Sequence, residues 1–292
     1  MDQLRHTRHS YGDNVRQRIS VWEPSPDIKP QSGGAWVIFI HGGAWGDPGN
    51  TDEDFIPSIN HVVASYDSLA RAPIRGFASI DYRLSPHPKH PQGPETPASE
   101  LRAAKHPDHI NDVWSALQFL VQEYDLASGR YILVGHSAGA TLAYQLCMGS
   151  YVLDGQAPPP SVPLPTTIIG ISGIYDLDGI DQRHGGNYAG FITSAFGSDR
   201  SRWGVASPAC CPDGHISGRN LPSHNILAWS PQDTLVDEPE IDEMVAKLKA
   251  NNANLLILKD LAGEHDHVWQ EGSQVCRLIK LALEQLEKSP QR

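Results

Sequence analysis

The chain has 292 residues, of which 39% are hydrophobic, and its 23 Lys and Arg against 34 Asp and Glu give a formal net charge of −11. This length allows a sizeable core, whereas the acidic balance, without any basic run, excludes the electrostatic signature of a nucleic-acid-binding protein and disfavours anionic membrane surfaces. No apolar run approaches the length of a membrane span, and residues 1–18 lack the apolar core of a signal peptide.

The predicted elements alternate between strands and helices along most of the chain. Residues 1–18 are expected to form an N-terminal arm and residues 19–292 a single domain. Apolar runs predict strands at residues 19–22, 35–40, 76–82, 131–134, 167–171, 225–229 and 255–258. Apolar residues at helical spacing predict helices over residues 55–71, 110–124, 140–144, 241–250 and 268–286. We therefore predict an α/β fold with a mainly parallel sheet covered by helices on both faces.

Three irregular segments interrupt this alternation. Residues 83–107 are polar and proline-punctuated and are predicted to loop. Residues 157–165 are interpreted as a surface loop rather than a linker or polyproline ligand, because the alternation resumes at residue 167. Residues 187–196 and the loops around them lack strand signals and are a candidate cap over a site.

The four cysteines are too few and too irregularly spaced for a disulfide scaffold or a zinc site. Cys147 and Cys276 lie in apolar helical patterns and are expected to be core residues. Cys210 and Cys211 lie in a Pro/Gly-rich loop, where nothing nearby is arranged to lower a thiol pKa. Cytoplasmic residence is the simplest account of this cysteine usage.

The stretch Gly135-His136-Ser137-Ala138-Gly139 carries the strongest chemical signal. It reads G-x-S-x-G between a predicted strand and a predicted helix, which is the context of a nucleophile elbow. A serine hydroxyl is a weak nucleophile near neutral pH, so it needs an imidazole to take its proton and a carboxylate to orient that imidazole. On this architecture the partners follow in the order Ser, acid, His, each beyond the carboxyl end of a strand.

Asp233 is the predicted acid because the strand at 225–229 leads directly into its loop. Asp176 follows an earlier strand and is the main alternative. Asp237 lies near a predicted helix start, where an acidic residue often complements the helix dipole.

His265 is the predicted base, because the strand at 255–258 leads into the turn at Gly263 and then to this residue. His267, two residues further on and nearer the final helix, is the alternative. These two histidines have no third residue at recognisable metal-ligand spacing, so no metal site is predicted.

The loop His41-Gly42-Gly43-Ala44-Trp45 follows the strand at 35–40, where an oxyanion hole is expected. Gly42 and Gly43 allow main chain to approach a carbonyl oxygen closely, and the backbone N–H of Ala138 supplies another donor. His41 is interpreted as a residue that fixes this loop through hydrogen bonds rather than as a base.

These motifs together resemble the hormone-sensitive-lipase-like branch of the α/β-hydrolases, and within it the fungal kynurenine formamidases. The match runs from Val37 to Trp269. The likeness to the formamidases rests on Tyr11-Gly12-Asp13-Asn14, Ser20-Val21-Trp22-Glu23-Pro24, His41-Gly42-Gly43-Ala44-Trp45 with Asp47-Pro48, Tyr82-Arg83-Leu84-Ser85-Pro86, and Gly263-Glu264-His265 before Trp269.

The resemblance implies hydrolysis of N-formyl-L-kynurenine to kynurenine and formate, a step of tryptophan breakdown towards NAD, without a metal or organic cofactor. It implies that Ser137 is the nucleophile, that Asp233 orients the base and that His265 is the base. The implied oxyanion donors are the N–H groups of Gly42, Gly43 and Ala138. Trp45 and Trp269 flank the site loops and are candidates for stacking on an aromatic substrate ring, with simple packing as the alternative.

Two other functions stay open at this point. One is a carboxylesterase for short acyl or aryl esters. The other is a non-catalytic receptor module, which usually shows a broken triad. The expected partner is a small aromatic formamide rather than a nucleic acid or a membrane, and a homodimer is compatible with the sequence.

Overall fold

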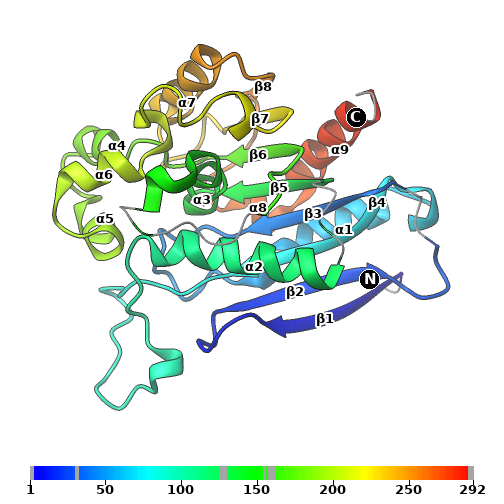
Figure 1. Cartoon of the computed structure of the whole chain (residues 1–292), viewed down its shortest axis with the longest axis horizontal. Coiled ribbons are helices and arrows are strands. Elements are labelled where there is room, and N and C mark those ends of the chain that lie inside the picture. The colour runs from blue at the N-terminus through cyan, green and yellow to red at the C-terminus, as the bar shows by residue number, and fades with distance from the viewer. Residues whose placement is uncertain are drawn as a thin grey trace.

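A computed structural model describes residues 3–29, 33–124, 126, 130–153, 156 and 162–288, and its centre is a single sheet (Figure 1). Its eight strands lie in the order β1-β2-β4-β3-β5-β6-β7-β8. The strands β3 to β8 run parallel, and β2 is antiparallel to both of its neighbours. The strand bounds are β1 Leu4–Ser10, β2 Arg18–Pro24, β3 Ala35–Ile40, β4 Ile74–Asp81, β5 Tyr131–His136, β6 Thr167–Ile171, β7 His224–Ala228 and β8 Leu255–Leu258.

Helices cover both faces of this sheet, as the sequence predicts (Figure 1). Their bounds are α1 Ile56–Ala64, α2 Asp108–Tyr124, α3 Ala138–Gln145, α4 Leu177–Arg183, α5 Ala189–Phe196, α6 Arg200–Ala206, α7 Glu238–Ala250, α8 His267–Glu271 and α9 Ser273–Lys288. Side chains alternate along β3, so Ile38 and Ile40 join one core with α2, α3 and α7. Val37 and Phe39 join a second core with α1 and α9. Every residue of β3 is buried.

The N-terminal segment differs from the predicted arm. Residues 4–10 form β1, which pairs with β2 in antiparallel register from Leu4↔Pro24 to Ser10↔Arg18. None of its residues is fully buried, and its sequence is rich in Arg and His, so the apolar alternation that marks a strand is missing. The strand is instead stabilised by its pairing with β2 and by contacts such as the stacking of His6 on Trp22, whose ring centroids are 4.8 Å apart.

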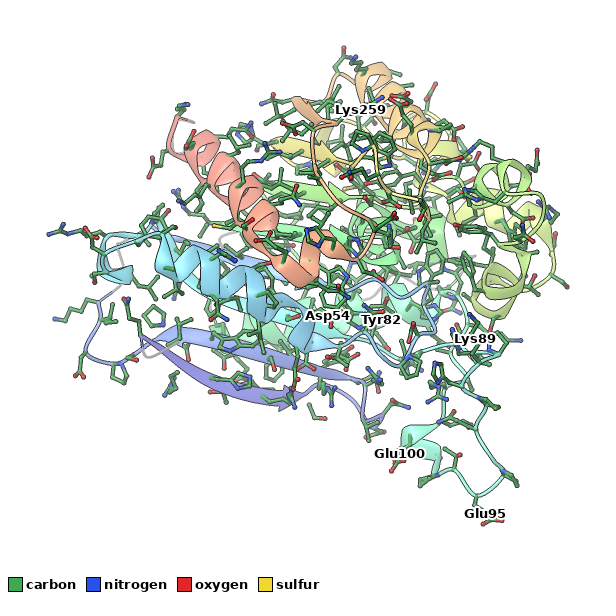
Figure 2. All side chains as sticks on the ribbon, turned by 180° about the vertical axis from the view of Figure 1, so that it is seen from behind. Asp54, Tyr82, Lys89, Glu95, Glu100 and Lys259 are labelled. Atoms are coloured by element: carbon green, nitrogen blue, oxygen red, sulfur yellow. The ribbon has the colours of Figure 1, made fainter. Side chains whose placement is uncertain are left out.

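Two predicted helices are shorter than expected. The helix predicted over 55–71 ends at Ala64, and a separate 3₁₀ turn, Leu69–Arg71, follows it. The closing helix is divided at Gly272, whose left-handed backbone separates α8 from α9. The proline-rich stretch 83–107 is a loop apart from the 3₁₀ turn Ala98–Glu100, and Figure 2 shows Glu95 and Glu100 where it projects from the body.

Several further expectations concern exposure. Cys147, Cys211 and Cys276 are buried and Cys210 is exposed. Burial raises the pKa of the Cys147 thiol to about 12. Although the Cys210 residue is exposed, desolvation of its sulfur by the surrounding protein, together with the nearby Asp176 carboxylate, raises the pKa of this thiol to about 12. Both pKa values oppose thiolate chemistry at these cysteines.

Among the described residues, no helix is long and apolar enough to cross a membrane. Of the loop at 157–165, residues 157–161 lie outside the described residues.

Candidate active site

Ser137 occupies a strained turn between β5 and α3. Its φ of 53° and ψ of −123° lie outside the regions that L-residues ordinarily adopt, and its N–H donates to Ile171 O at 2.9 Å. The turn is so tight that a Cβ on Gly139 would lie 2.1 Å from Ile40 O. Glycine is therefore required at this position, and the serine is held at the carboxyl end of the central strand.

Asp233 and His265 form a hydrogen-bonded pair in the loops after β7 and β8. His265 Nδ1 lies 2.8 Å from Asp233 Oδ2, and both side chains are almost fully buried. Asp233 Oδ1 accepts the backbone N–H groups of Leu235 at 2.9 Å and Val236 at 2.8 Å. Burial opposes ionisation of Asp233, but the His265 and Val236 contacts outweigh it and hold the pKa of this carboxyl below its usual value. The carboxylate is thus a charged, fixed acceptor for the imidazole.

The alternative residues are engaged elsewhere. Asp176 begins α4, where its Oδ1 accepts the N–H of Asp178 at 3.2 Å. Asp237 pairs with Arg183 at 2.7 Å. His267 is exposed in the first turn of α8. The structure therefore brings Asp233, rather than Asp176 or Asp237, to His265.

His136 links the elbow to the base, a contact that the sequence reasoning did not find. Its Nε2 lies 3.1 Å from the carbonyl oxygen of His265, and the two ring centroids are 4.5 Å apart. Burial, together with the neighbouring His265, lowers the pKa of His136 to about 3, so this ring is neutral at physiological pH and donates to the carbonyl. Because His136 directly precedes Ser137, the contact holds the turn that carries Ser137 against the loop that carries His265. The one feature of the sequence that could have indicated this role is that His136 directly precedes Ser137 in the G-x-S-x-G motif.

One group of side chains has the composition of a metal site. His136, His265 and the exposed Asp266 offer ligand atoms that lie within 4.8 Å of one another. His136 Nε2 faces the His265 carbonyl at 3.1 Å, and Asp266 Oδ1 accepts the indole N–H of Trp269 at 3.0 Å. These hydrogen bonds compete with coordination by the same groups.

The loop from His41 to Trp45 lies against the elbow. A Cβ on Gly42 would lie 3.0 Å from Ser137 Cβ and 3.0 Å from His136 Nδ1, so the main chain here directly borders the nucleophile. Gly43 lies against the Asn50 side chain, and Ala138 is the first residue of α3. Backbone N–H groups of Gly42, Gly43 and Ala138 thus belong to the two segments that enclose Ser137.

Comparison with known proteins agrees with this geometry. Residues 37–192 match the sequence family described as alpha/beta hydrolase fold. The chain is 33% identical over 281 residues to the kynurenine formamidase-like hydrolase fscH of Fusarium equiseti, covering 93% of this chain and 90% of that protein. It is also 33% identical over 273 residues to the kynurenine formamidase avaC of Aspergillus versicolor, covering 87% and 90%. The chain belongs to the α/β-hydrolase family.

A solved structure supports the same fold. Esterase B from Lactobacillus rhamnosis superposes on this α/β-hydrolase with a TM-score of 0.69 at 17% identity, covering 98% of this chain and 87% of that one. At this identity the likeness describes the fold, and the fungal relatives carry the information on chemistry.

The loop at residues 41–45 of this α/β-hydrolase, the expected oxyanion loop, is held in place by His41, Asp81 and Tyr82. His41 Nε2 lies 3.0 Å from Asp81 Oδ1, and its ring stacks on Tyr82 at 4.4 Å between centroids. Tyr82 Oη donates to Gly42 O at 3.0 Å. Figure 2 shows Tyr82 near Asp54 in the interior of the molecule. His41 therefore makes the loop-fixing contacts expected of it.

Arg16, a residue that the sequence analysis did not identify, also stabilises this region from the turn between β1 and β2. Its Nη2 donates to Pro48 O at 2.7 Å and its Nη1 to Asn50 O at 2.9 Å. The same guanidinium lies 3.4 Å from the buried Asp81 carboxylate. One side chain thus ties the segment after the oxyanion loop to the carboxylate that holds His41.

Trp45 differs from the expectation of substrate stacking, and for Trp269 stacking stays a prediction. Trp45 is 0% exposed and packs edge-on against Phe196 of α5, at 4.8 Å between ring centroids, so it has no free face. The packing alternative is correct for Trp45. Trp269 is partly exposed and donates its indole N–H to Asp266.

Proposed function

We propose that this hydrolase cleaves the formyl C–N bond of N-formyl-L-kynurenine, giving L-kynurenine and formate, a step of tryptophan catabolism. The observation that carries the proposal is the likeness, at 33% identity over most of the chain, to two fungal proteins, one named a kynurenine formamidase and the other a kynurenine formamidase-like hydrolase. The hydrogen-bonded Asp233–His265 pair, which contacts His136 directly before Ser137, provides the acid and base that such an acyl transfer needs.

In the proposed mechanism Ser137 Oγ attacks the formyl carbon while His265 Nε2 takes the hydroxyl proton. Asp233 accepts the Nδ1–H of His265 and stabilises the imidazolium that forms. The C–N bond then breaks, and the imidazolium returns its proton to the leaving aryl amine. A formyl group remains esterified to Ser137.

Water completes the cycle by the same chemistry. His265 removes a proton from the water that attacks the formyl ester. The C–O bond to Ser137 then breaks while the imidazolium returns that proton to Ser137 Oγ, and formic acid leaves and ionises to formate. Both tetrahedral intermediates carry an oxyanion, for which the N–H groups of Gly42, Gly43 and Ala138 are the proposed donors. Each such donor typically contributes about 3 kcal/mol of transition-state stabilisation.

The test is to give the purified enzyme N-formyl-L-kynurenine beside p-nitrophenyl esters, with Ser137→Ala as the matched control. We expect rapid release of formate from the formamide by wild type and none by Ser137→Ala, which should keep the wild-type circular dichroism spectrum. Fast ester turnover with an untouched formamide would replace the proposal by the carboxylesterase alternative. Formamide turnover that survives Ser137→Ala would overturn the assigned nucleophile.

A further inference from the structure

The cap helix α5 bridges the acid loop and the oxyanion loop. It lies with α4 and α6 at one end of the molecule (Figure 1). Tyr188, immediately before α5, donates its hydroxyl to Leu235 O, and Leu235 N–H in turn donates to Asp233. Burial, followed by the Asp233 charge, raises the pKa of Tyr188 to about 12, so the phenol stays a neutral donor next to the acid.

Aromatic rings continue from Tyr188 to the oxyanion loop. Phe191, three residues along, lies 5.1 Å from the Tyr188 ring at 66° and 6.3 Å from the Trp45 ring. Tyr188 and Phe191 are both partly exposed, whereas Trp45 is fully buried behind them. The accessible aromatic surface between the two loops is therefore on α5, not on Trp45.

The helix is held firmly enough to present these rings. Ser194 Oγ donates to Pro86 O at 2.6 Å, which fixes α5 to the segment after β4. Asp181 Oδ1 accepts the Tyr188 N–H at 3.1 Å, and its other oxygen pairs with Arg200 at 2.9 Å. Because α5 is fixed at both ends, little conformational entropy is lost from these rings when a ligand binds.

We propose that Tyr188 and Phe191 form the subsite for the aromatic leaving group, making this pair the determinant of aryl over alkyl selectivity. The assignment rests on the proposed cleavage of an aryl amide by Ser137. An aryl group placed between the acid and oxyanion loops contacts these two rings, and aromatic pairs stabilise each other in edge-on or offset-stacked geometry. Trp45 supports the subsite from behind by packing on Phe191.

The experiment compares kcat/KM for phenyl acetate and ethyl acetate in wild type, Phe191→Leu and Tyr188→Leu. Each leucine variant should lower the phenyl-to-ethyl ratio about tenfold, the upper range for loss of one aromatic pair. Tyr188→Phe should keep the ratio because the ring remains. Phe119→Leu is the matched control: the same substitution at a partly exposed ring of α2, which packs on His9 and Tyr124, should leave the ratio at its wild-type value.

An unchanged ratio in both leucine variants with native circular dichroism spectra would overturn the subsite. An equal fall in Phe119→Leu would overturn it too, because the effect would then come from a general loss of aromatic packing. Turnover of N-formyl-L-kynurenine by wild type is scored separately. A lower phenyl-to-ethyl ratio in the leucine variants, without formamide turnover by wild type, would refute the proposed function and support the aryl subsite. Formamide turnover by wild type with an unchanged ratio in the variants would support the proposed function and refute the aryl subsite.

Discussion

His109 in α2 offers a quantitative test of the buried polar interior beneath the loop after β4. Its imidazole is completely buried, with Nε2 at 3.0 Å from Ser85 Oγ, and Nδ1 has no hydrogen-bond partner among the described residues. Burial, followed by the neighbouring His106 and Arg83, lowers the pKa of His109 to about 3. The folded protein thus keeps this ring neutral at pH values where the unfolded chain protonates it.

The sign and size of the effect follow from proton linkage. Between an unfolded pKa of about 6.5 and a folded pKa of about 3, the unfolded state binds the extra proton, so stability is lost as pH falls through this window. From pH 7 to pH 5.5 the loss from one such histidine is about 1.2 kcal/mol, because the unfolded ring becomes roughly ten-to-one protonated. The result depends little on the folded value, provided that it lies well below 5.5.

The perturbation is His109→Gln, assayed by urea unfolding at pH 7 and pH 5.5. The variant is expected to be less stable at both values, since it disturbs the Ser85 contact, but its loss between them should be smaller than that of wild type by about 1.2 kcal/mol. Contributions from His136 and from other titrating groups are common to both proteins and cancel in this difference. Equal losses in wild type and variant would refute the assignment of a neutral, buried His109.

Three predictions concern the site. Asp233→Asn should lower kcat by about 10³- to 10⁴-fold in steady-state assays, whereas Asp176→Asn should keep turnover and change the free energy of unfolding little, because asparagine caps a helix as well as aspartate; the opposite pattern of turnover would exchange their roles. Gly42→Ala should reduce kcat by more than about tenfold with little change in KM, since its methyl group would crowd Ser137 and displace an oxyanion donor; an unchanged kcat would remove Gly42 from the oxyanion hole. Arg16→Gln should lower kcat about tenfold and weaken a phosphonate transition-state analogue equally, by loosening the oxyanion loop; a loss of stability alone would assign Arg16 a purely structural role.

Much of the fold could be predicted because its signals are local. Continuous apolar runs marked β3 and β5, and a serine between glycines after a strand marked the elbow. The order of the loops after β7 and β8 placed Asp233 and His265 among the candidates for the same reason, because parallel strands end at one edge of a sheet. The strand β1 escaped prediction because its stability comes from its partner rather than from its own pattern.

The sequence by itself determined the parallel sheet, the elbow at Ser137 and a short list of acids and bases that follow later strands. Only the tertiary structure decided that Asp233 rather than Asp176 meets His265, that Trp45 is buried, and that the accessible rings belong to α5. Turns and strands are encoded by neighbouring residues, whereas burial and side-chain pairing depend on segments that are far apart in the chain. Arg16 shows the same limit, because it reaches Pro48 and Asp81 only after β1 and β2 have joined the sheet.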